Sequence, residues 1–381
     1  MQWKVPLFET DFGPAELEAV QEPVRRGWLT LGELTQELER QFAERVGVRH
    51  AFAVSNCTVG LHLCTAAAGL GPGDEVICPT LTFVATANAI KYVGATPVFA
   101  DSVSEDNLNI GPEQVERCIT PRTKAILVVH YAGFPVDMPG IMALAERHKL
   151  IVLEDCAHAL FSRVAGRTCG AWGQSAAFSF FGNKNMTCGE GGMVTTDSDE
   201  VAEKVRLMRS HGMTTLTLDR YKGRAFQYDV VSHGYNYRLD EIRASLALAQ
   251  LRRLPQFLCE RQRVRDRYVA RLAGSPVKVP HFDWAARSGP GDYVGHHIMP
   301  VLLPAGMDRP ALAARLKEAG IQTSVHYRAV HTFSAFASGV ASGPRPVFTE
   351  ALADRELTLP MYPTQSDGQV DLVCEALLEC L

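Results

Sequence analysis

Short apolar runs alternate with amphipathic segments of helical spacing along the middle of the chain. The apolar runs predict strands at residues 50–54, 75–78, 97–101, 125–130, 151–155, 176–180 and 193–196. The segments between them predict helices at residues 58–70, 84–92 and 141–148, with stop signals at Gly71-Pro72-Gly73 and Gly94. Because β-branched strands that alternate with helices are typical of sheets buried on both faces, the pattern predicts an α/β fold with a largely parallel sheet.

The pattern changes toward the C-terminus. Residues 239–272 predict a long charged amphipathic helix, interrupted at Pro255, that leads out of the large domain. A strand at 298–303 and a helix at 309–319 then predict a smaller α+β domain. Two further segments rich in Gly, Pro and Ser predict loops, at 289–292 and 338–346.

These elements suggest three parts. Residues 1–30 are expected to form an arm packed on the large domain, which would span 31–250. Residues 251–381 would then form the linker helix and the small C-terminal domain.

Composition narrows the class of protein. Hydrophobic residues make up 46% and charged residues 21%, and the formal net charge of -4 gives no reason to expect nucleic acid or an anionic membrane as a partner. No apolar run approaches the roughly 20 residues of a membrane span, and the first residues lack a signal-peptide core. The ten cysteines form no CxxC pair, which disfavours a zinc cluster and suits free thiols in a reducing cytosol. We therefore expect a cytoplasmic protein without a metal site.

Polar residues that could take part in catalysis or ligand binding lie at or after the ends of three predicted strands. Asp155 closes one strand, Ser55-Asn56-Cys57-Thr58 links another to a helix, and Ser179 and Lys184 lie in and after a third. Ligands of open α/β sheets bind at the carboxyl ends of the strands, and a helix beginning near Thr58 would offer free N–H groups to a phosphate. A lysine and a carboxylate beside a phosphate site fit pyridoxal phosphate: the lysine forms an imine, and the carboxylate keeps the pyridine nitrogen protonated.

Each of these residues also has a plain structural interpretation. Asp155 could be a cap, the Ser-Asn-Cys-Thr turn only a helix start, and Lys184 a solvated surface charge. Phe83 would normally lie in a core, and His158 could be a satisfied structural histidine. Several of them at one sheet edge, in a fold that binds ligands there, favour a site.

The order of several motifs resembles a known family. The chain is similar to the DegT/DnrJ/StrS sugar aminotransferases, which are fold-type I pyridoxal-phosphate enzymes, from Gly27-Trp28-Leu29-Thr30 to about Arg271. The motifs that carry the resemblance are residues 71–77, 82–90, 94–99, 154–158, 181–192 and 234–238. The resemblance implies a mostly parallel seven-stranded sheet flanked by helices, with a smaller C-terminal α+β domain.

The resemblance also implies roles for single residues. Lys184 would bind the cofactor covalently and then act as acid and base, and Asp155 would pair with the pyridinium nitrogen. His158 would lie near the phenolic oxygen of the ring, and Phe83 would stack on the ring face. The phosphate would be held by Cys57, Thr58, Val59 and Ser179, and across a homodimer interface by Asn236. Contacts to substrate or amino donor are expected from Trp28, Thr30, Asn183, Arg238, His326 and Tyr327.

Two positions depart from the family pattern. Cys57 stands where the phosphate turn usually has glycine, which leaves the turn's dihedral angles less free. Cys188 replaces a small or hydroxylic residue. Neither change removes a group that the chemistry needs.

The resemblance implies a ping-pong transamination. L-glutamate would convert the cofactor to pyridoxamine phosphate, and the amine would then pass to a ketone on a nucleotide-linked deoxysugar. Lys184 argues against the branch of the family that carries histidine there and dehydrates sugars. Glu190 in Thr-Cys-Gly-Glu-Gly-Gly favours C4 of a 4-keto-6-deoxyhexose, since the 3-keto enzymes more often have Asp there. The expected nucleotide is dTDP, with GDP and UDP as alternatives.

Three other functions stay open at this stage. The ketone could belong to a keto-cyclitol such as scyllo-inosose, or to C3 of a sugar. A non-catalytic protein that binds pyridoxal phosphate would share the fold, although the intact Lys184 and Asp155 speak against it. The end product, an antibiotic sugar or a cell-surface glycan, is not determined by these motifs.

Overall fold

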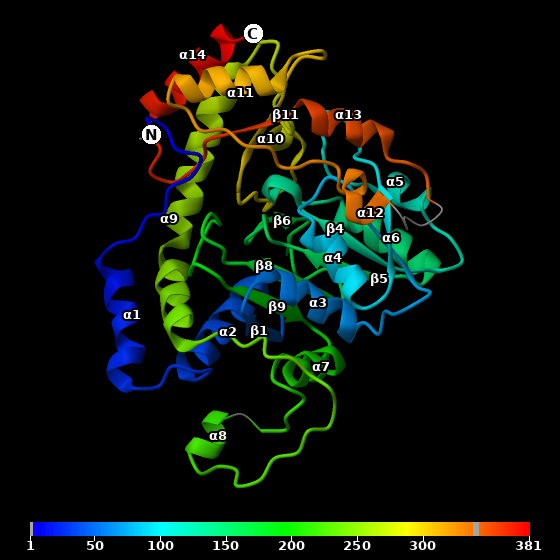
Figure 1. The fold of residues 1–381 in the computed structure, drawn as a ribbon, viewed down its shortest axis with the longest axis vertical. Helices are drawn as coiled ribbons and strands as arrows, with labels where there is room; N and C mark the ends of the chain where they lie inside the picture. The colour runs from blue at the N-terminus through cyan, green and yellow to red at the C-terminus, as the bar shows by residue number, and fades with distance from the viewer. Residues whose placement is uncertain (1–2, 216, 338–342) are drawn as a thin grey trace.

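A seven-stranded sheet forms the centre of the protein (Figure 1). The computed structural model describes residues 3–215, 217–337 and 343–381. In the sheet, the strands follow the order β1-β9-β8-β5-β4-β2-β3. Only β9 runs against its two neighbours; the other strands of this sheet share one direction. The strands are β1 (His50–Val54), β2 (Glu75–Pro79), β3 (Thr96–Ala100), β4 (Thr123–Val129), β5 (Ile151–Asp155), β8 (Ser175–Ser179) and β9 (Gly192–Thr196). The predicted mostly parallel sheet and all seven of its predicted strands are therefore confirmed. The ends of β1 and β5 agree with the prediction, and those of the other strands are shifted by one or two residues.

Helices cover both faces of this sheet, as the continuous apolar strands require. Successive residues of β4 show the two faces, because Ala125 and Leu127 join one buried cluster while Ile126 and Val128 join another. The first face packs on helices α3 (Cys57–Ala67), α4 (Ala85–Tyr92) and α7 (Asp199–Arg209). The second packs on α5 (Pro112–Glu116) and α6 (Met138–His148). Near β1, β8 and β9, helices α2 (Glu33–Val46) and α9 (Glu241–Leu272) complete a third cluster.

The C-terminal part is smaller and mixed. A two-stranded antiparallel sheet joins β10 (Met299–Leu302) to β11 (Glu356–Leu359). Around it lie α11 (Arg309–Glu318), α13 (Val347–Arg355), α14 (Asp367–Glu379) and the end of α9. The remaining short elements are β6 (Arg163–Val164), β7 (Arg167–Thr168), α8 (Thr217–Tyr221), α10 (Trp284–Arg287), α12 (Ser334–Ala337) and the 3-10 helices η1 (Tyr131–Gly133) and η2 (Val330–Thr332). The predicted strand and helix of this part are confirmed, while the domain boundaries stay predictions.

The predicted interruption of the long helix at Pro255 is wrong. Helix α9 continues from Glu241 to Leu272 through this proline. Proline inside a helix costs about 3 kcal/mol relative to alanine. Here Pro255 lies on the exposed face, and buried side chains of the same helix, Leu251, Leu254, Phe257 and Leu258, hold it on both sides. Tertiary packing therefore outweighs the local preference.

The N-terminal arm contacts more than the large domain. Helix α1 (Pro14–Arg26) packs along α9, where Arg253 pairs with Asp11 and Glu16. Before it, however, the chain pairs with the C-terminal part: Lys4 N–H donates to Gly320, and residues 5 and 321 form a parallel bridge. Residues 1–2 lie outside the described residues. For residues 3–30 the expectation of packing on the large domain is incomplete, because residues 4 and 5 pair with residues 320 and 321 of the C-terminal part, a contact with no local sequence signal.

The remaining expectations concern loops, thiols and membranes. Residues 289–292 form a turn as predicted; of the predicted loop 338–346, residues 338–342 lie outside the described residues and 343–346 are irregular. All ten cysteines fall in the described part of the chain, and they are free thiols. Within that part, no helix is both long and apolar enough to cross a membrane.

Candidate active site

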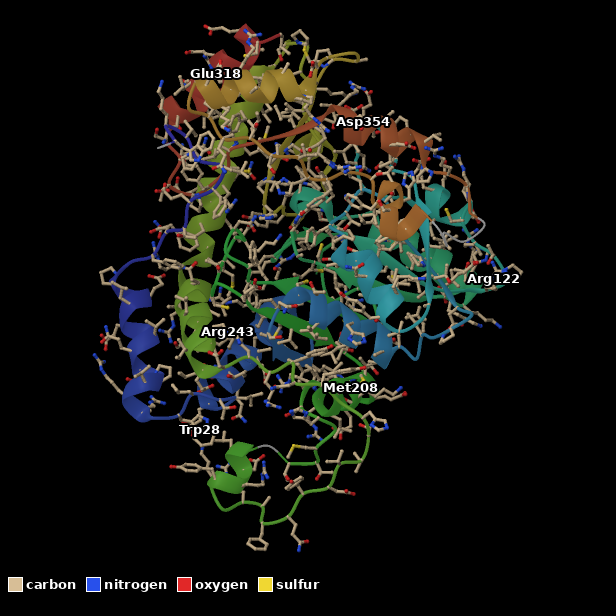
Figure 2. The ribbon with its side chains drawn as sticks, in the orientation of Figure 1. Trp28, Arg122, Met208, Arg243, Glu318 and Asp354 are labelled. Carbon is tan, nitrogen blue, oxygen red and sulfur yellow. The ribbon has the colours of Figure 1, made fainter. Side chains whose placement is uncertain are left out.

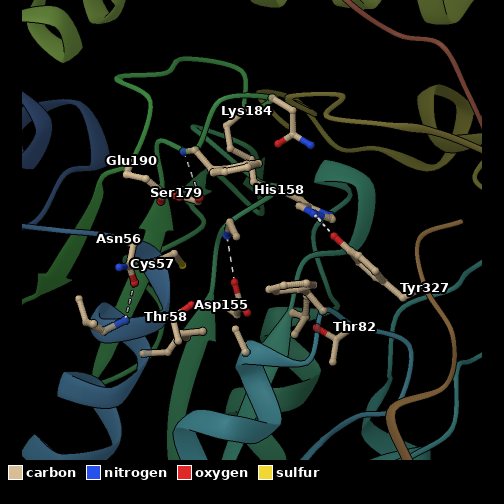
Figure 3. Close-up of a pocket in the computed structure, with 18 of the residues that line it drawn as sticks. Asn56, Cys57, Thr58, Thr82, Asp155, His158, Ser179, Lys184, Glu190 and Tyr327 are labelled. Carbon is tan, nitrogen blue, oxygen red and sulfur yellow. Dashed lines mark hydrogen bonds between the residues drawn. The ribbon is translucent and has the colours of Figure 1, made fainter. Parts of the chain in front are cut away.

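A cavity of about 690 Å³ opens at the carboxyl ends of β1, β4, β5 and β8 (Figure 3). Eleven of the residues to which the family resemblance gives a binding or catalytic role line it: Cys57, Thr58, Val59, Phe83, Asp155, His158, Ser179, Asn183, Lys184, His326 and Tyr327. Asp155 and Ser179 end neighbouring strands, so the parallel pairing of β5 and β8 brings their side chains to one edge. The sheet thus gathers groups that are up to 270 positions apart, from Cys57 to Tyr327 (327 − 57).

The start of helix α3 forms one wall of the cavity. Asn56 is its N-cap, and the Asn56 Oδ1 accepts the N–H of Val59 at 3.0 Å. The N–H groups of Cys57 and Thr58 precede that amide in the first turn, where no intrahelical acceptor exists. Because Cys57 already lies inside the helix, the position tolerates a side chain, which explains the departure from glycine. The glycine that this turn requires is Gly192, whose added Cβ would lie 2.9 Å from the Cys57 nitrogen.

Lys184 projects into the cavity from the loop after β8 (Figure 3). Burial lowers the pKa of its ammonium to about 8, with a further contribution from the Arg261 guanidinium and opposition from Cys57 and Asp155. Its Nζ lies 3.1 Å from the Nε2 of His297. A substantial fraction of this lysine is therefore a neutral amine at physiological pH, as a nucleophile or base must be.

The tautomer of His297 follows from its other nitrogen. Its Nδ1 lies 3.2 Å from the Oδ1 of Asn185, whose Nδ2 donates to the Gly295 carbonyl at 2.6 Å. An amide oxygen can only accept, so Nδ1 carries the proton and Nε2 offers its lone pair to Lys184. Burial and the nearby Lys184 hold the pKa of His297 well below its usual range, which keeps this acceptor neutral. The Arg261 side chain on α9 fixes the same segment by donating to the His297 carbonyl at 3.0 Å.

Asp155 lies deep in the same cavity. Its Oδ2 accepts the hydroxyl of Thr86 at 2.8 Å, and its Oδ1 accepts the Ala157 N–H at 3.1 Å. Thr86 is in turn 2.8 Å from the hydroxyl of Thr82. Burial raises the pKa of Asp155, although the Thr86 and Ala157 hydrogen bonds and the charge of Lys184 oppose the shift. A cationic partner in the cavity would favour the ionised carboxylate.

Aromatic rings form the wall opposite these groups. His158 Nδ1 accepts the Ala132 N–H at 3.3 Å, so its Nε2 carries the proton and lies 2.9 Å from the Tyr327 hydroxyl. Its ring centroid is 4.4 Å from that of His297. Phe83 is 55% exposed, which excludes the interpretation that it is a core residue. Its ring lies at the cavity wall with the Tyr327 ring 5.9 Å away.

Four of the predicted residues do not line the cavity. Trp28, labelled in Figure 2, packs against Tyr221 of α8, with ring centroids 4.7 Å apart and the ring planes tilted by 43°. Arg238 donates to the Ser210 hydroxyl at 3.1 Å. Thr30 and Asn236 are exposed on the surface. Within one chain these four side chains therefore contact neither Lys184 nor Asp155.

Several residues that support the groups in the cavity were not predicted from the sequence. His297 contacts Lys184, and Asn185 and Arg261 hold the segment of His297. Thr86, hydrogen-bonded to Thr82, holds Asp155. Thr82 and Thr86 lie inside one of the motifs named above, so their motif could have suggested them. Nothing local distinguishes His297, which follows another histidine and is 113 positions from Lys184.

A buried cluster beside the site is structural. His130, Glu154 and Cys156 place possible metal ligands within 4.8 Å of one another. Both Glu154 oxygens, however, accept backbone N–H groups, from Gly170 on one side and from Trp172 and Gly173 on the other. The carboxylate therefore anchors the loop before β8.

The groups in the cavity fit pyridoxal phosphate. The donor set contains one amine with a lowered pKa, one buried carboxylate, and the open first turn of a helix flanked by the hydroxyls of Thr58 and Ser179. The amine suits the aldehyde, the carboxylate the ring nitrogen, and the helix end with its hydroxyls the phosphate. Lys184, Asp155, Thr58 and Ser179 are thus the residues that would hold the cofactor.

Comparison with known proteins agrees with a pyridoxal-phosphate site, because the similar sequences and structures include aminotransferases. The sequence model of the DegT/DnrJ/EryC1/StrS aminotransferase family matches residues 11–378. The spore coat polysaccharide biosynthesis protein SpsC of Bacillus subtilis (strain 168) is 40% identical over 383 residues, which cover 99% of this chain and 96% of that protein. The aminotransferase TlmJ from Streptoalloteichus hindustanus has a TM-score of 0.89 at 34% identity, over 99% of this chain and 98% of that one. DesV from S. venezuelae, solved with a ketimine intermediate, has a TM-score of 0.89 at 32% identity, over 100% and 98%.

Proposed function

We propose that this chain, which belongs to the DegT/DnrJ/EryC1/StrS aminotransferase family, transfers an amino group from L-glutamate to a keto carbon of a nucleotide-linked deoxysugar, with pyridoxal phosphate as its cofactor. The observation that carries this proposal is the shared cavity of Lys184 and Asp155, in which burial lowers the pKa of the lysine to about 8. A surface lysine would keep its ordinary pKa and would lack such a partner.

The chain's own residues would divide the work as follows. Pyridoxal phosphate, when bound, supplies the electron sink for the substrate carbon. Lys184 would move a proton at its Nζ, and His297 Nε2 would accept a hydrogen bond from that amine and so hold it in place. Asp155 would balance the positive ring nitrogen, with Thr86 orienting the carboxylate. Phe83 would cover one face of the flat ring.

The preferred sugar is dTDP-4-keto-6-deoxyglucose, aminated at C4. Glu190, the residue on which this preference rests, lines the same cavity as Lys184, which puts it within reach of a sugar that reacts there. The name of SpsC, whose relative this chain is, favours a sugar destined for a polysaccharide. A keto-cyclitol or a 3-keto sugar would use the same lysine and aspartate and differ only in its contacts with the outer cavity.

The absorbance of the cofactor and a substrate panel test this proposal. Adding L-glutamate to the protein reconstituted with pyridoxal phosphate should remove the absorbance band near the visible edge, because the cofactor leaves the aldehyde state. The protein in its pyridoxamine phosphate form should then aminate dTDP-4-keto-6-deoxyglucose faster than scyllo-inosose or a dTDP-3-keto sugar. Mass spectrometry of the aminated products measures these rates. An unchanged band with no aminated sugar would instead favour a protein that binds the cofactor without catalysis.

We further propose that the active unit is a homodimer with shared sites. The described residues of the segment after α7, 211–215 and 217–237, extend away from the body of the protein and carry α8 near their far end (Figure 1). Its apolar side chains are open to solvent: Phe226 is 98% exposed, and Tyr228, Val230 and Val231 are each more than half exposed. Apolar groups displayed together on an extended segment are typical of interfaces. Asn236, at the base of this segment, is exposed and does not line the cavity of its own chain.

Mixing two inactive variants tests the shared site. Lys184→Ala and Asn236→Ala should each lose activity alone. A heterodimer of the two keeps one site with both residues intact if Asn236 serves the partner's cofactor. Random mixing should then restore about one quarter of wild-type activity, since about half of the dimers are mixed and each has one good site. If Asn236 acts in its own subunit, mixing restores nothing.

A further inference from the structure

A buried carboxylate, a hydroxyl and an imidazole form a chain that ends in the active-site cavity. Glu356 Oε1 accepts the hydroxyl of Thr358 at 2.5 Å, and that hydroxyl oxygen lies 2.9 Å from the Nδ1 of His326. The other oxygen of Glu356, Oε2, accepts the backbone N–H of His326 at 2.8 Å. His326 lines the cavity, whereas Glu356 does not. Glu356 therefore holds His326 twice, once through its backbone and once through Thr358.

The hydrogen bonds determine which ring nitrogen carries the proton. When Glu356 is ionised, the single proton of the Thr358 hydroxyl must go to the carboxylate. The hydroxyl oxygen can then only accept, so His326 Nδ1 is protonated. His326 Nε2, the ring nitrogen that remains for the cavity, presents a lone pair.

The hydrogen bonds between Glu356, Thr358 and His326 can also reverse their direction, because only protons have to move and the heavy atoms stay in place. If Nε2 takes a proton from the cavity, Nδ1 passes its own proton to the Thr358 oxygen, and the hydroxyl passes its proton to Glu356 Oε1. One proton enters and one carboxylate is neutralised, so charge and atoms balance. Glu356 Oε2 still accepts the His326 N–H in this state, and Nε2 has become a donor.

The surroundings of Glu356 suit such a change. Its side chain is fully buried, with 0% exposure. Burial raises the pKa of Glu356 to about 7, against the hydrogen bonds from Thr358 and His326 and the charge of Arg309 at the start of α11. The other titratable groups that face it are the phenols of Tyr131 and Tyr327, and burial raises the pKa of both. Burial and Lys184 lower the pKa of His326 to about 4, so the imidazole itself stays neutral.

We propose that Glu356, Thr358 and His326 form a proton relay that sets the substrate-facing character of His326 Nε2. This proposal rests on the proposed function, since the substrate is the keto sugar. With Glu356 ionised, Nε2 accepts a hydrogen bond from a sugar hydroxyl. With Glu356 protonated, Nε2 donates instead, so the hydroxyl must reverse its direction and its proton loses this acceptor. His326 is then the residue that contacts the substrate, and Glu356 and Thr358 are positioning residues.

Histidine NMR tests the relay without any substrate. The sample is full-length protein reconstituted with pyridoxal phosphate and labelled with ¹⁵N-histidine, and the His326→Asn variant assigns the His326 signal. This signal should change from the Nδ1–H to the Nε2–H tautomer as the pH falls from about 8.5 to about 5.5. Glu356→Gln should show Nε2–H at both values, because its amide oxygen takes the His326 N–H and its NH₂ group donates to Thr358. Thr358→Val should lose the change and Thr358→Ser should keep it. One unchanging tautomer in the wild-type protein would overturn the relay.

Kinetics test the consequence for the substrate. At about pH 8.5, Glu356→Gln should raise the KM for the keto sugar about tenfold, the value of one hydrogen bond, while leaving kcat little changed. At about pH 5.5 the two proteins should have the same KM, because the wild-type carboxyl is then protonated. An equal KM ratio at both pH values would sink the substrate contact. If no keto sugar is aminated, the proposed function fails, and the NMR result still decides the relay.

Discussion

Replacing Lys184 with alanine should reduce turnover by at least about 10³-fold, because the covalent contact and the acid–base group are lost together. The absorbance band of the lysine-bound cofactor should disappear as well. The fold should persist, since Lys184 lies in a loop and its side chain contacts the cavity and His297. Single-turnover amination and the absorbance spectrum measure these effects.

The matched control is Lys91→Ala. Lys91 is an exposed lysine on α4, so its loss should leave turnover within about twofold of wild type, as is usual for surface substitutions. Turnover retained in Lys184→Ala would contradict the assignment of the lysine, whatever the control shows. Loss of helical circular dichroism in Lys184→Ala would point to a folding defect, and Lys184→Arg, which keeps the side-chain length and charge, would then replace it.

Replacing Asp155 with asparagine should reduce kcat by about 10²- to 10⁴-fold, the usual range for losing a group that assists proton transfer. The amide can still accept the Ala157 N–H and can face the Thr86 hydroxyl, so the local geometry is kept. What disappears is the negative charge that would hold a proton on the ring nitrogen. Steady-state kinetics with saturating cofactor separate this effect from weaker cofactor binding.

Two further variants show how large the loss of kcat in Asp155→Asn is compared with the loss of one hydrogen bond and with a surface substitution. Thr86→Val removes one of the two hydrogen bonds to the carboxylate and should cost about tenfold in kcat, the value of one buried hydrogen bond. Asp137→Asn is the control, because Asp137 is an exposed N-cap of α6 and asparagine caps equally well. Normal turnover in Asp155→Asn would remove the aspartate from the chemistry.

The strand pattern was predictable because its signal is local. A strand covered on both faces must be apolar at successive positions, and residues 125–128 (Ala-Ile-Leu-Val) meet this requirement. The positions of Asp155 and Lys184 after two such strands were visible in the same way. Since β5 and β8 are neighbours in the sheet, position along the sequence was enough to bring the two groups together.

Other features needed long-range contacts. Local propensity predicted a break at Pro255, yet the buried residues on either side of it keep α9 continuous. Trp28 and Arg238 belong to matching motifs, and only the tertiary structure separates them from the cavity of their own chain. The hydrogen bond between His297 and Lys184 joins two segments whose spacing carries no periodic signal.

The sequence by itself determined the order of strands and helices. It also determined the lysine, the aspartate and the helix start of the cavity, because apolar runs and the polar residues at their ends predict each of them. Only the tertiary structure decided what tunes those groups. The neutral His297 beside Lys184 and the link from Glu356 through Thr358 to His326 arise where separate segments meet. Burial shifts the pKa of a group only once the chain has closed around it, and hydrogen-bond direction depends on which partners the fold supplies.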